Sequence, residues 1–417
     1  MIIDSLRYDG ACSCGKEHKM QTEFSVITSG ALYDLEIYLE RYGLSGYTVA
    51  VYDENTYRAT ADRHPKVNGE VILDPKDLHA NEHGVELLMQ SLPKEAEVLV
   101  AVGSGTIHDL TRYCAYKLGI DFVSCPTAAS VDGFCSSVAA MTWHGCKKTL
   151  TAVAPRIVVA DTDIIKNAPI RLAKSGFGDM IGKYVALCDW KIGNILTGEF
   201  YCERIANMTL DAAKEVLSSI DGIMSGSSEA YEKLTYGLLL SGLAMQMMGN
   251  SRPASGAEHH VSHLIEMSPP PLGLSSDALH GEKVGVGTLL AIREYKRLAA
   301  AGSPSFADYS PFSGELIRSV FGDSMAEEIL GENKNDCALG ITGRLVSEKW
   351  EDIRAVIDEL PSPMELGDIY SRFKIKAGLS DIGVSEEARY ALLTYSYLVR
   401  NRLTLMRIRR CIAHAMG

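Results

Sequence analysis

The sequence has no surplus of basic residues, because 41 lysines and arginines stand against 53 aspartates and glutamates and leave a net charge of −12. Nucleic acids and anionic membrane surfaces are bound by cationic protein faces. The composition therefore argues against both as partners and favours a small-molecule ligand. Hydrophobic residues still make up 46% of the 417 residues, enough for a globular protein with substantial buried cores.

The sequence also lacks a long apolar run. Its most apolar stretch, GLLLSGLAMQMM at 237–248, is too short to span a bilayer. The first twenty residues have no apolar core behind a basic start, so we expect no signal peptide. Ten cysteines occur without a disulfide-like spacing. We therefore expect reduced thiols and a cytoplasmic protein.

The segment CSCGKEH brings Cys12, Cys14 and His18 close together in the sequence. It could be half of a metal site. A structural zinc site needs four ligands, however, and no second Cys/His pair stands nearby. We expect a turn that leads into the following strand.

Short β-branched runs alternate with helical patterns in the first part of the chain. We expect strands at 47–53, 97–105, 120–130 and 154–161, with helices at 29–43 and 80–92. Strands that alternate with helices are typical of a parallel sheet covered by helices on its faces. Residues 1–167 are therefore predicted to form an α/β domain.

Long amphipathic patterns dominate the rest of the chain, and few strands are expected there. The patterns cover 202–220, 232–248, 347–360 and 385–412. Three consecutive prolines interrupt 266–281, which we expect to be a loop. Residues 168–417 are predicted to form an all-α domain, and no internal repeat is found.

A glycine-containing turn at Gly103 and Gly105 lies between a predicted strand and a helix that opens near Thr106. Such a turn lets backbone amides and the positive helix end approach a phosphate. The pattern is neither GxGxxG nor a Walker loop, so an ordinary strand-to-helix turn explains it about as well. Asp53 ends another strand, where it could accept ribose hydroxyls or cap a helix.

The segment SGAEHHVSHLIEM contains His259, His260 and His263. If it is helical, His259 and His263 share one face, and His260 points about 100° away. His280 begins a later helical run, and Asp179 lies between glycines at an expected helix opening. An Asp and His residues from separate helices could form an open catalytic metal site, although a single helical His is more often an ordinary surface or core residue.

Five motifs occur in order, namely VAVGSGTIHD, CPTAASVDGFCS, SGFGDMIGK, SGAEHHVSH and LHGEKVGVG. Together they resemble the sn-glycerol-1-phosphate dehydrogenases, whose fold is shared by metal-dependent glycerol dehydrogenases and dehydroquinate synthases. The length of the chain and its CSCGKEH start suggest the bacterial branch of this family. The resemblance implies an N-terminal nucleotide-binding domain and a helical metal- and substrate-binding domain. It also implies NAD or NADP, one nickel or zinc ion per chain, a small phosphorylated substrate and a homodimer.

Carried over residue by residue, the resemblance also assigns the cofactor site. The pyrophosphate would be held after Gly103 by Gly105, Thr106, Ile107, His108 and Asp109. The nicotinamide side would be lined by Thr127, Ala128, Ala129, Ser130 and Ser136. The reaction implied is the reversible oxidation of sn-glycerol 1-phosphate to dihydroxyacetone phosphate.

The resemblance further implies that Asp179, His259 and His280 are the metal ligands, with Asp179 also near the substrate. Asp132 and His263 would contact the substrate and act in catalysis, His263 by moving a proton. His260 would be a bystander. Glu266 could orient His263, although a solvated glutamate is the more ordinary interpretation.

Two residues depart from the family pattern. Ser104 stands where a third glycine is common, and Lys283 stands where glutamine is common. Lysine at this position also occurs in non-phosphorylated glycerol dehydrogenases, so such an enzyme remains an alternative. A dehydroquinate synthase-like lyase and a non-catalytic metal- or nucleotide-binding protein are further alternatives.

Overall fold

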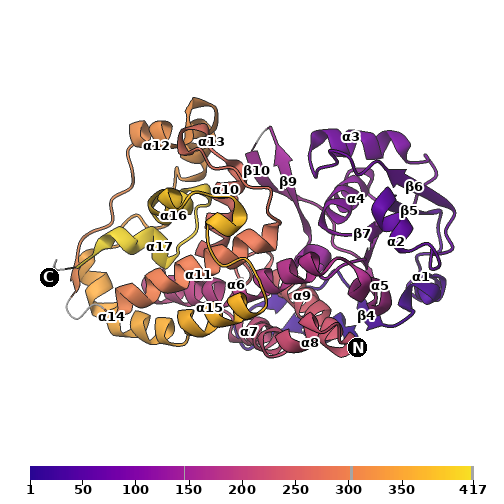
Figure 1. Ribbon diagram of the computed structural model, residues 1–417, viewed down its shortest axis with the longest axis horizontal. Coiled ribbons are helices and arrows are strands. Elements are labelled where there is room, and N and C mark those ends of the chain that lie inside the picture. Colours follow the sequence, from indigo (N-terminus) through magenta and orange to yellow (C-terminus); the bar gives the residue numbers. More distant parts are fainter. Residues whose placement is uncertain (145, 301–303, 415–417) are drawn as a thin grey trace. The chain divides into compact units, whose positions relative to one another are not determined.

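The structure, a computed structural model, describes residues 1–144, 146–300 and 304–414. It divides into two compact units (Figure 1). Unit 1 comprises Met1–Met180 and Asp211–Asn250, and unit 2 comprises Ile181–Leu210 and Ser251–Gly417. Two helices, α6 (Ile170–Thr197) and α7 (Glu203–Ser218), contribute residues to both units.

Seven strands in the described part of unit 1 form one sheet. Neighbouring strands are parallel except for the edge pair of β1 and β4. In spatial order the strands are β1 (Ile2–Asp4), β4 (Phe24–Thr28), β11 (Ile157–Asp161), β8 (Asp121–Pro126), β7 (Val98–Gly103), β5 (Thr48–Asp53) and β6 (Gly69–Leu73). The four predicted strands are confirmed as β5, β7, β8 and β11.

Both faces of this sheet are apolar, which explains why its strands are rich in valine. Ala50 and Tyr52 of β5 pack on one face with α1 (Leu35–Arg41), whereas Val49 and Val51 pack on the other with α3 (Glu82–Ser91) and α4 (Gly105–Leu118). Further helices of unit 1 are α2 (Glu54–Ala59), α5 (Thr162–Asn167), α8 (Ile220–Met224) and α9 (Ser228–Met248). The predicted covered parallel sheet is confirmed.

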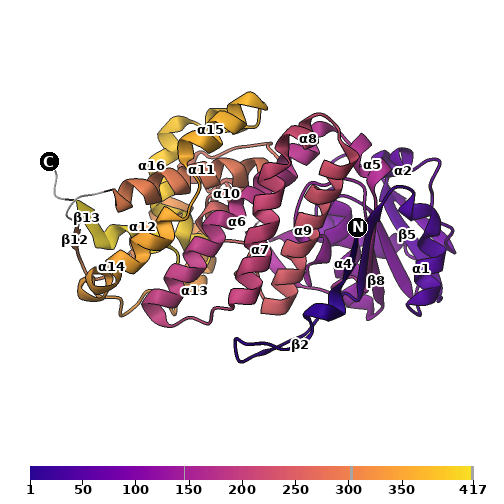
Figure 2. The ribbon, with the colours of Figure 1, turned by 90° about the horizontal axis from the view of Figure 1, so that it is seen from below.

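Two small hairpins accompany the sheet. One consists of β2 (Gly10–Ala11) and β3 (Glu17–His18), the indigo loop labelled β2 in Figure 2. The other, β9 (Val138–Trp143) with β10 (Cys146–Thr151), was not predicted from the sequence.

Unit 2 is largely helical. Its core joins apolar side chains of α10 (Ala257–Met267), α11 (His280–Ala299), α12 (Gly314–Phe321), α13 (Asp323–Glu332) and α16 (Arg389–Tyr395). It also contains α14 (Gly343–Asp358), α15 (Pro363–Arg372) and α17 (Leu405–Ile408). A short antiparallel ribbon of β12 (Pro304–Phe306) and β13 (Ile412–His414) is added to this otherwise helical unit.

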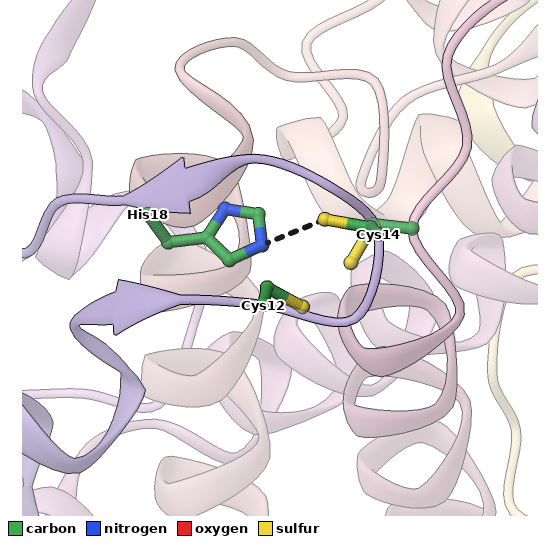
Figure 3. Close-up of side chains that lie close together, drawn as sticks. Cys12, Cys14 and His18 are labelled. Carbon is green, nitrogen blue, oxygen red and sulfur yellow. Dashed lines mark hydrogen bonds between the residues drawn. The ribbon is translucent and has the colours of Figure 1, made fainter.

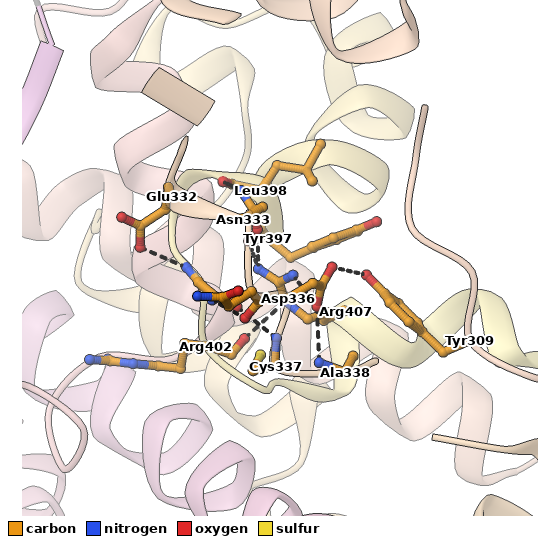
Figure 4. Close-up of polar contacts among 12 residues, drawn as sticks. Tyr309, Glu332, Asn333, Asp336, Cys337, Ala338, Tyr397, Leu398, Arg402 and Arg407 are labelled. Atoms are coloured by element: carbon orange, nitrogen blue, oxygen red, sulfur yellow. Dashed lines mark hydrogen bonds and ion pairs between the residues drawn. The ribbon is translucent and has the colours of Figure 1, made fainter. Parts of the chain in front are cut away.

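The amphipathic pattern over 385–412 does not form one continuous helix. Between α16 and α17 the carbonyl groups of Tyr397, Arg400 and Arg402 accept hydrogen bonds from the guanidinium of Arg407, at 2.8, 2.7 and 3.1 Å. Arg407 is fully buried and pairs with Asp336 at 2.9 Å. Figure 4 shows these contacts converging on Arg407. Backbone carbonyls that bind this buried cation are not available to a helix.

Among the described residues, no helix combines the length and the apolar character needed to cross a membrane.

Candidate active site

The first part of the candidate site is the carboxyl edge of the sheet in unit 1. From β5 the chain continues to β6 on one side, whereas from β7 it continues to β8 on the other. In open parallel sheets, ligands bind where the strand order reverses in this way. Asp53 ends β5 and Gly103 ends β7, and these strands are neighbours. Thr127 follows β8, and its N–H donates to the carbonyl of Gly103 at 2.9 Å.

The turn after β7 is shaped by two glycines with different surroundings. A Cβ atom on Gly103 would lie 2.6 Å from Cβ of Ile107, so the return of the chain into α4 requires glycine there. A Cβ atom on Gly105 would meet only Val131, at an ordinary 3.6 Å. Packing within the protein therefore does not explain Gly105, whereas close approach of a ligand to the backbone does.

Helix α4 begins at Gly105, and no side chain caps its first turn. Its first amide groups, which include those of Thr106 and Ile107, are therefore oriented as anion donors. Ser104, which replaces the family's third glycine, lies 2.8 Å from Ser130 through their hydroxyl oxygens. Ser104 therefore connects the turn after β7 to the segment predicted to line the nicotinamide.

His108 is buried and makes its contacts within the protein. The two ring nitrogens of His108 contact the carbonyl of Ser104 at 3.0 Å and the hydroxyl of Ser124 at 2.8 Å. Burial lowers the pKa of His108 to about 3, so its ring is neutral. Asp109 lies 3.9 Å from Arg112. If His108 and Asp109 contribute to pyrophosphate binding, they do so as residues near the start of α4.

Asp53 has a local structural role that the sequence left open. Its carboxylate accepts the Thr56 N–H at 2.8 Å, and the Thr56 hydroxyl oxygen in turn accepts the Asp53 N–H at 3.0 Å. This capping box begins α2. One carboxylate oxygen of Asp53 is therefore engaged at the end of β5, and the position remains suitable for a ribose hydroxyl.

The segment after β8 is buried. Thr127, Ala128, Ala129 and Ser130 are each at most 6% exposed, and Ser136 is 5% exposed. Helix α6 packs closely on it, since a Cβ atom on Gly176 would lie 2.1 Å from the Ala129 carbonyl oxygen.

Asp132 connects this segment to Asp179. Its N–H donates to the Asp179 carboxylate at 3.0 Å, and its own carboxylate accepts the Ser241 hydroxyl at 2.8 Å. We expected Asp179 at the start of a helix, and this expectation was wrong. Asp179 lies inside α6, which begins directly after Pro169 and continues through Gly176. Asp179 is fully buried, so a carboxylate there requires partners.

The second part of the site is a group of potential metal ligands. One ligand atom each from Asp179, His259 and His280 lies within 4.8 Å of the other two. His259 belongs to α10 and His280 begins α11. Helix α11 can approach α10 because of Gly287, where a Cβ atom would lie 2.6 Å from the carbonyl oxygen of Glu258. The segment that the histidine spacing assumed to be helical does form α10, and the predicted loop after it is confirmed.

Each histidine of this group has its Nδ1 atom beside a carboxylate. Nδ1 of His259 lies 2.7 Å from Glu258, and Nδ1 of His280 lies 2.9 Å from Glu266. Carboxylate partners on Nδ1 are common for metal-binding histidines, because they fix the ring and leave Nε2 to bind the ion. Glu258 was not predicted from the sequence, and Glu266 was expected beside His263. The structure instead places Glu266 beside His280, with its side chain only 9% exposed, so Glu266 is not a solvated surface residue.

The other two histidines differ from each other. The ring of His263 lies 6.0 Å from the rings of both His259 and His280, measured between centroids. Burial lowers its pKa well below the ordinary value, partly opposed by Glu266. His260 is 1% exposed, and neither ring nitrogen has a hydrogen-bond partner among the described residues. The helical spacing places His260 on a different face of α10 from His259 and His263, and the structure agrees.

Lys283 lies one turn into α11 and is 7% exposed. Its ammonium nitrogen lies 3.7 Å from the Glu266 carboxylate. A buried lysine beside a buried glutamate retains its charge more easily than an isolated one. The residue that departs from the family pattern is therefore in the immediate surroundings of His280.

Comparisons with known proteins show which family and fold the chain resembles. Residues 26–169 match the iron-containing alcohol dehydrogenase family. The chain is 32% identical to a Bacillus licheniformis protein named glycerol-1-phosphate dehydrogenase with NAD(P)+, covering 96% of this chain and 92% of that protein. It is 38% identical to a protein of the same name from Halalkalibacterium halodurans, covering 72% and 77% of the two chains. A probable glycerol dehydrogenase from Sinorhizobium meliloti has the same fold, with a TM-score of 0.57, 17% identity and coverage of 90% and 98%.

Proposed function

Because the chain belongs to the glycerol-1-phosphate dehydrogenase family, we propose that it catalyses the reversible oxidation of sn-glycerol 1-phosphate to dihydroxyacetone phosphate. The reaction uses NAD or NADP and a divalent metal ion. The observation that carries this proposal is the grouping of Asp179, His259 and His280. Carboxylates on the Nδ1 atoms of both histidines strengthen it.

The nucleotide is held at the carboxyl edge of the sheet. Its pyrophosphate binds the uncapped start of α4 at Gly105, with Gly103 providing the tight turn. The nicotinamide lies along Thr127 to Ser130 and Ser136. Asp53 accepts hydrogen bonds from the adenosine ribose, which favours NAD because its carboxylate repels a 2′-phosphate.

Asp179, His259 and His280 would hold the metal, and three protein ligands suit a catalytic rather than a closed structural site. An ion bound there supplies Lewis acidity, which lowers the pKa of a hydroxyl group and polarises a carbonyl group. One carboxylate and two imidazoles suit either zinc or nickel. Glu258 and Glu266 hold the two rings in place.

His263 and Asp132 act on the substrate. His263 lies on the same face of α10 as His259 and moves the proton of the secondary hydroxyl, a role that suits an imidazole. Asp132 orients the substrate and, through its backbone N–H, also fixes the Asp179 carboxylate.

A glycerol dehydrogenase is the second candidate, favoured by Lys283 at a position where the phosphate-specific family often has glutamine. Assays with NADH and either dihydroxyacetone phosphate or dihydroxyacetone separate the two. The proposal expects a much higher kcat/KM with the phosphorylated ketone. Equal or higher efficiency with dihydroxyacetone would favour the second candidate, and no net NADH consumption with either ketone would favour a lyase or a binding protein.

Residues 1–167 form the dinucleotide-binding domain in this proposal, and residues 168–417 form the metal- and substrate-binding domain. We propose a cytoplasmic location from the expected reduced cysteines and the expected lack of a signal peptide, and a homodimer because the family resemblance implies one. Light scattering on the purified protein tests the oligomeric state, and a mass near that of one 45.4 kDa chain would contradict it.

A further inference from the structure

The N-terminal hairpin of unit 1 gathers three side chains that bind metals well. Cys12 and Cys14 lie in the turn between β2 and β3, and His18 ends β3. Figure 3 shows the three side chains together at the hairpin. The Cys14 sulfur lies 3.4 Å from Nε2 of His18. Sulfur and nitrogen ligands of a tetrahedral zinc ion are about 3.6 Å apart, given ordinary bond lengths.

The backbone holds this turn in a defined shape. The Cys12 N–H donates to the carbonyl of Lys16, and the Gly15 N–H donates to the carbonyl of Cys12, both at 3.0 Å. Gly15 has a φ of +86°, which glycine adopts without strain. The thiol groups of Cys12 and Cys14 are therefore carried on an ordered turn, which lowers the entropy cost of binding one ion.

His18 is oriented as metal-binding histidines usually are. It is 2% exposed, and its Nδ1 atom lies 2.8 Å from the carbonyl oxygen of Met247 in α9. A carbonyl can only accept, so Nδ1 carries the hydrogen and Nε2 carries the lone pair. That lone pair belongs to the nitrogen facing Cys14. A backbone carbonyl on the second ring nitrogen is typical of a histidine that binds a metal.

Cys202 completes the set. It lies between α6 and α7, far from the hairpin in sequence, and is fully buried. Ligand atoms of Cys12, Cys14, His18 and Cys202 all lie within 4.8 Å of one another. The sequence favoured a simple turn over a metal site, because no second Cys/His pair stands near His18 along the chain.

We propose that these four residues bind a structural zinc ion, separate from the ion of the proposed active site. Three thiolates and one imidazole are a common set for structural zinc, and four protein ligands leave no position for substrate. The set differs in chemistry from Asp179, His259 and His280, which contain no sulfur. This inference does not rest on the proposed enzymatic function. Binding of an ion by such a set adds its free energy to the stability of the folded protein.

The first test measures zinc per chain on full-length protein purified with zinc and passed through gel filtration. The wild type should hold about two zinc ions, one in each four-coordinate site. The double variant Cys12→Ser/Cys14→Ser should lose one, and so should His259→Ala/His280→Ala. Cys337→Ser and His64→Ala are matched controls, because both residues lie outside every group of potential ligands in the described chain. Both controls should retain wild-type zinc.

The second test uses cobalt(II), and its first measurement needs only the wild-type protein. Cobalt bound by thiolates gives an intense charge-transfer absorption in the near ultraviolet, which a site of carboxylate and imidazole lacks. The wild type and His259→Ala/His280→Ala should both show this band, whereas Cys202→Ser should lose or markedly weaken it.

Absence of the thiolate band in wild-type protein would overturn the proposal. Zinc content unchanged in Cys12→Ser/Cys14→Ser would also overturn it, and an unaltered band in Cys202→Ser would remove Cys202 from the ligand set. A protein that binds zinc at the hairpin but reduces neither ketone would leave this site intact and contradict only the proposed function.

Discussion

His259, His260 and His263 are close neighbours in sequence, yet their rings have different surroundings. His259 contacts Glu258 and belongs to the metal-ligand group, whereas His260 is buried without a hydrogen-bond partner among the described residues. His263 shares the face of His259 without belonging to the group that includes Asp179. His259 and His260 are adjacent in α10, so their side chains point about 100° apart. One is a proposed metal ligand, and the other packs in the core.

His263→Ala should retain nearly normal metal content but lose activity. Proton transfer by a positioned side chain contributes roughly 10² to 10⁴-fold to a rate, so turnover with dihydroxyacetone phosphate should fall within that range. His259→Ala is the comparison, and it should lose metal and activity together. Metal content and steady-state rates are measured on the same preparations. If His263→Ala also loses its metal, His263 is a ligand, and if its rate is normal, it is a packing residue.

The sequence could predict the candidate residues but not their partners. Spacing alone places His259 and His263 on one face of a helix. The contact of Glu266 with His280 instead depends on how the loop after Pro269 returns the chain to α11, which no local pattern specifies. The group of Cys12, Cys14, His18 and Cys202 likewise joins residues that are far apart in the sequence. Long-range contacts of this kind leave no periodicity in the sequence.

Asp53→Asn should reduce the preference for NADH over NADPH. Asparagine caps a helix about as well as aspartate, so α2 should be preserved while the carboxylate charge is lost. A charged hydrogen bond worth about 1.5 kcal/mol corresponds to roughly a tenfold change in the ratio of kcat/KM values. Glu54→Gln, one residue away, is the control for a general change in charge. An unchanged ratio in Asp53→Asn would mean that Asp53 only caps α2.

At the level of elements, helix α6 shows why glycines inside a helix can be informative. The GFGDMIG segment suggested the start of a helix. Helix α6 in fact begins earlier, and Gly176 and Gly182 both lie within it. A Cβ atom on Gly176 would meet the Ala129 carbonyl oxygen at 2.1 Å, and one on Gly182 would meet Val284 at 2.8 Å. These glycines allow close packing on each side of Asp179. Because glycine has a low helix propensity, the sequence did not indicate that the helix continues through these positions.

Gly176→Ala should therefore destabilise the protein and disturb cofactor binding. The clash is with a backbone atom, which cannot rotate away, so we expect a loss of about 1 to 3 kcal/mol, as for other overpacked sites. Gly331→Ala in α13 is the matched control, because nothing lies within 4 Å of its added Cβ atom. It should be neutral or stabilising by up to about 1 kcal/mol. Denaturant unfolding and the NADH dissociation constant are measured for both, and equal behaviour of the two variants would contradict the packing argument.

The C-terminal segment illustrates the opposite error. Its apolar spacing over 385–412 suited a helix, but the buried guanidinium of Arg407 binds three backbone carbonyls there and pairs with Asp336. A buried cation requires such partners. Hydrophobic patterns indicate which residues are buried, but they do not show that a charged residue is buried among them. The parallel sheet was easier to predict, because its strands are covered on both faces and bounded by turn residues.

At the scale of the whole molecule, the net negative charge of the protein disfavours the approach of the anionic substrate that we propose. The protein carries a net charge of −12, and dihydroxyacetone phosphate is an anion. Distant exposed charges act over a Debye length that falls from about 30 Å at 0.01 M salt to about 8 Å at 0.15 M. Buried contacts, such as those near Lys283, are screened much less. The attraction needed for binding must therefore be local, and the surrounding field is repulsive.

Added salt should therefore weaken the repulsion more than the local attraction. We expect the KM for dihydroxyacetone phosphate to fall by about twofold between 0.01 and 0.15 M potassium chloride, as distant charges are screened. The KM for neutral dihydroxyacetone should not change and serves as the control. Both are measured at saturating NADH, so that cofactor binding does not limit the rate. A KM for the phosphorylated ketone that rises steadily with salt would show that the field around the site is positive despite the net charge of the chain.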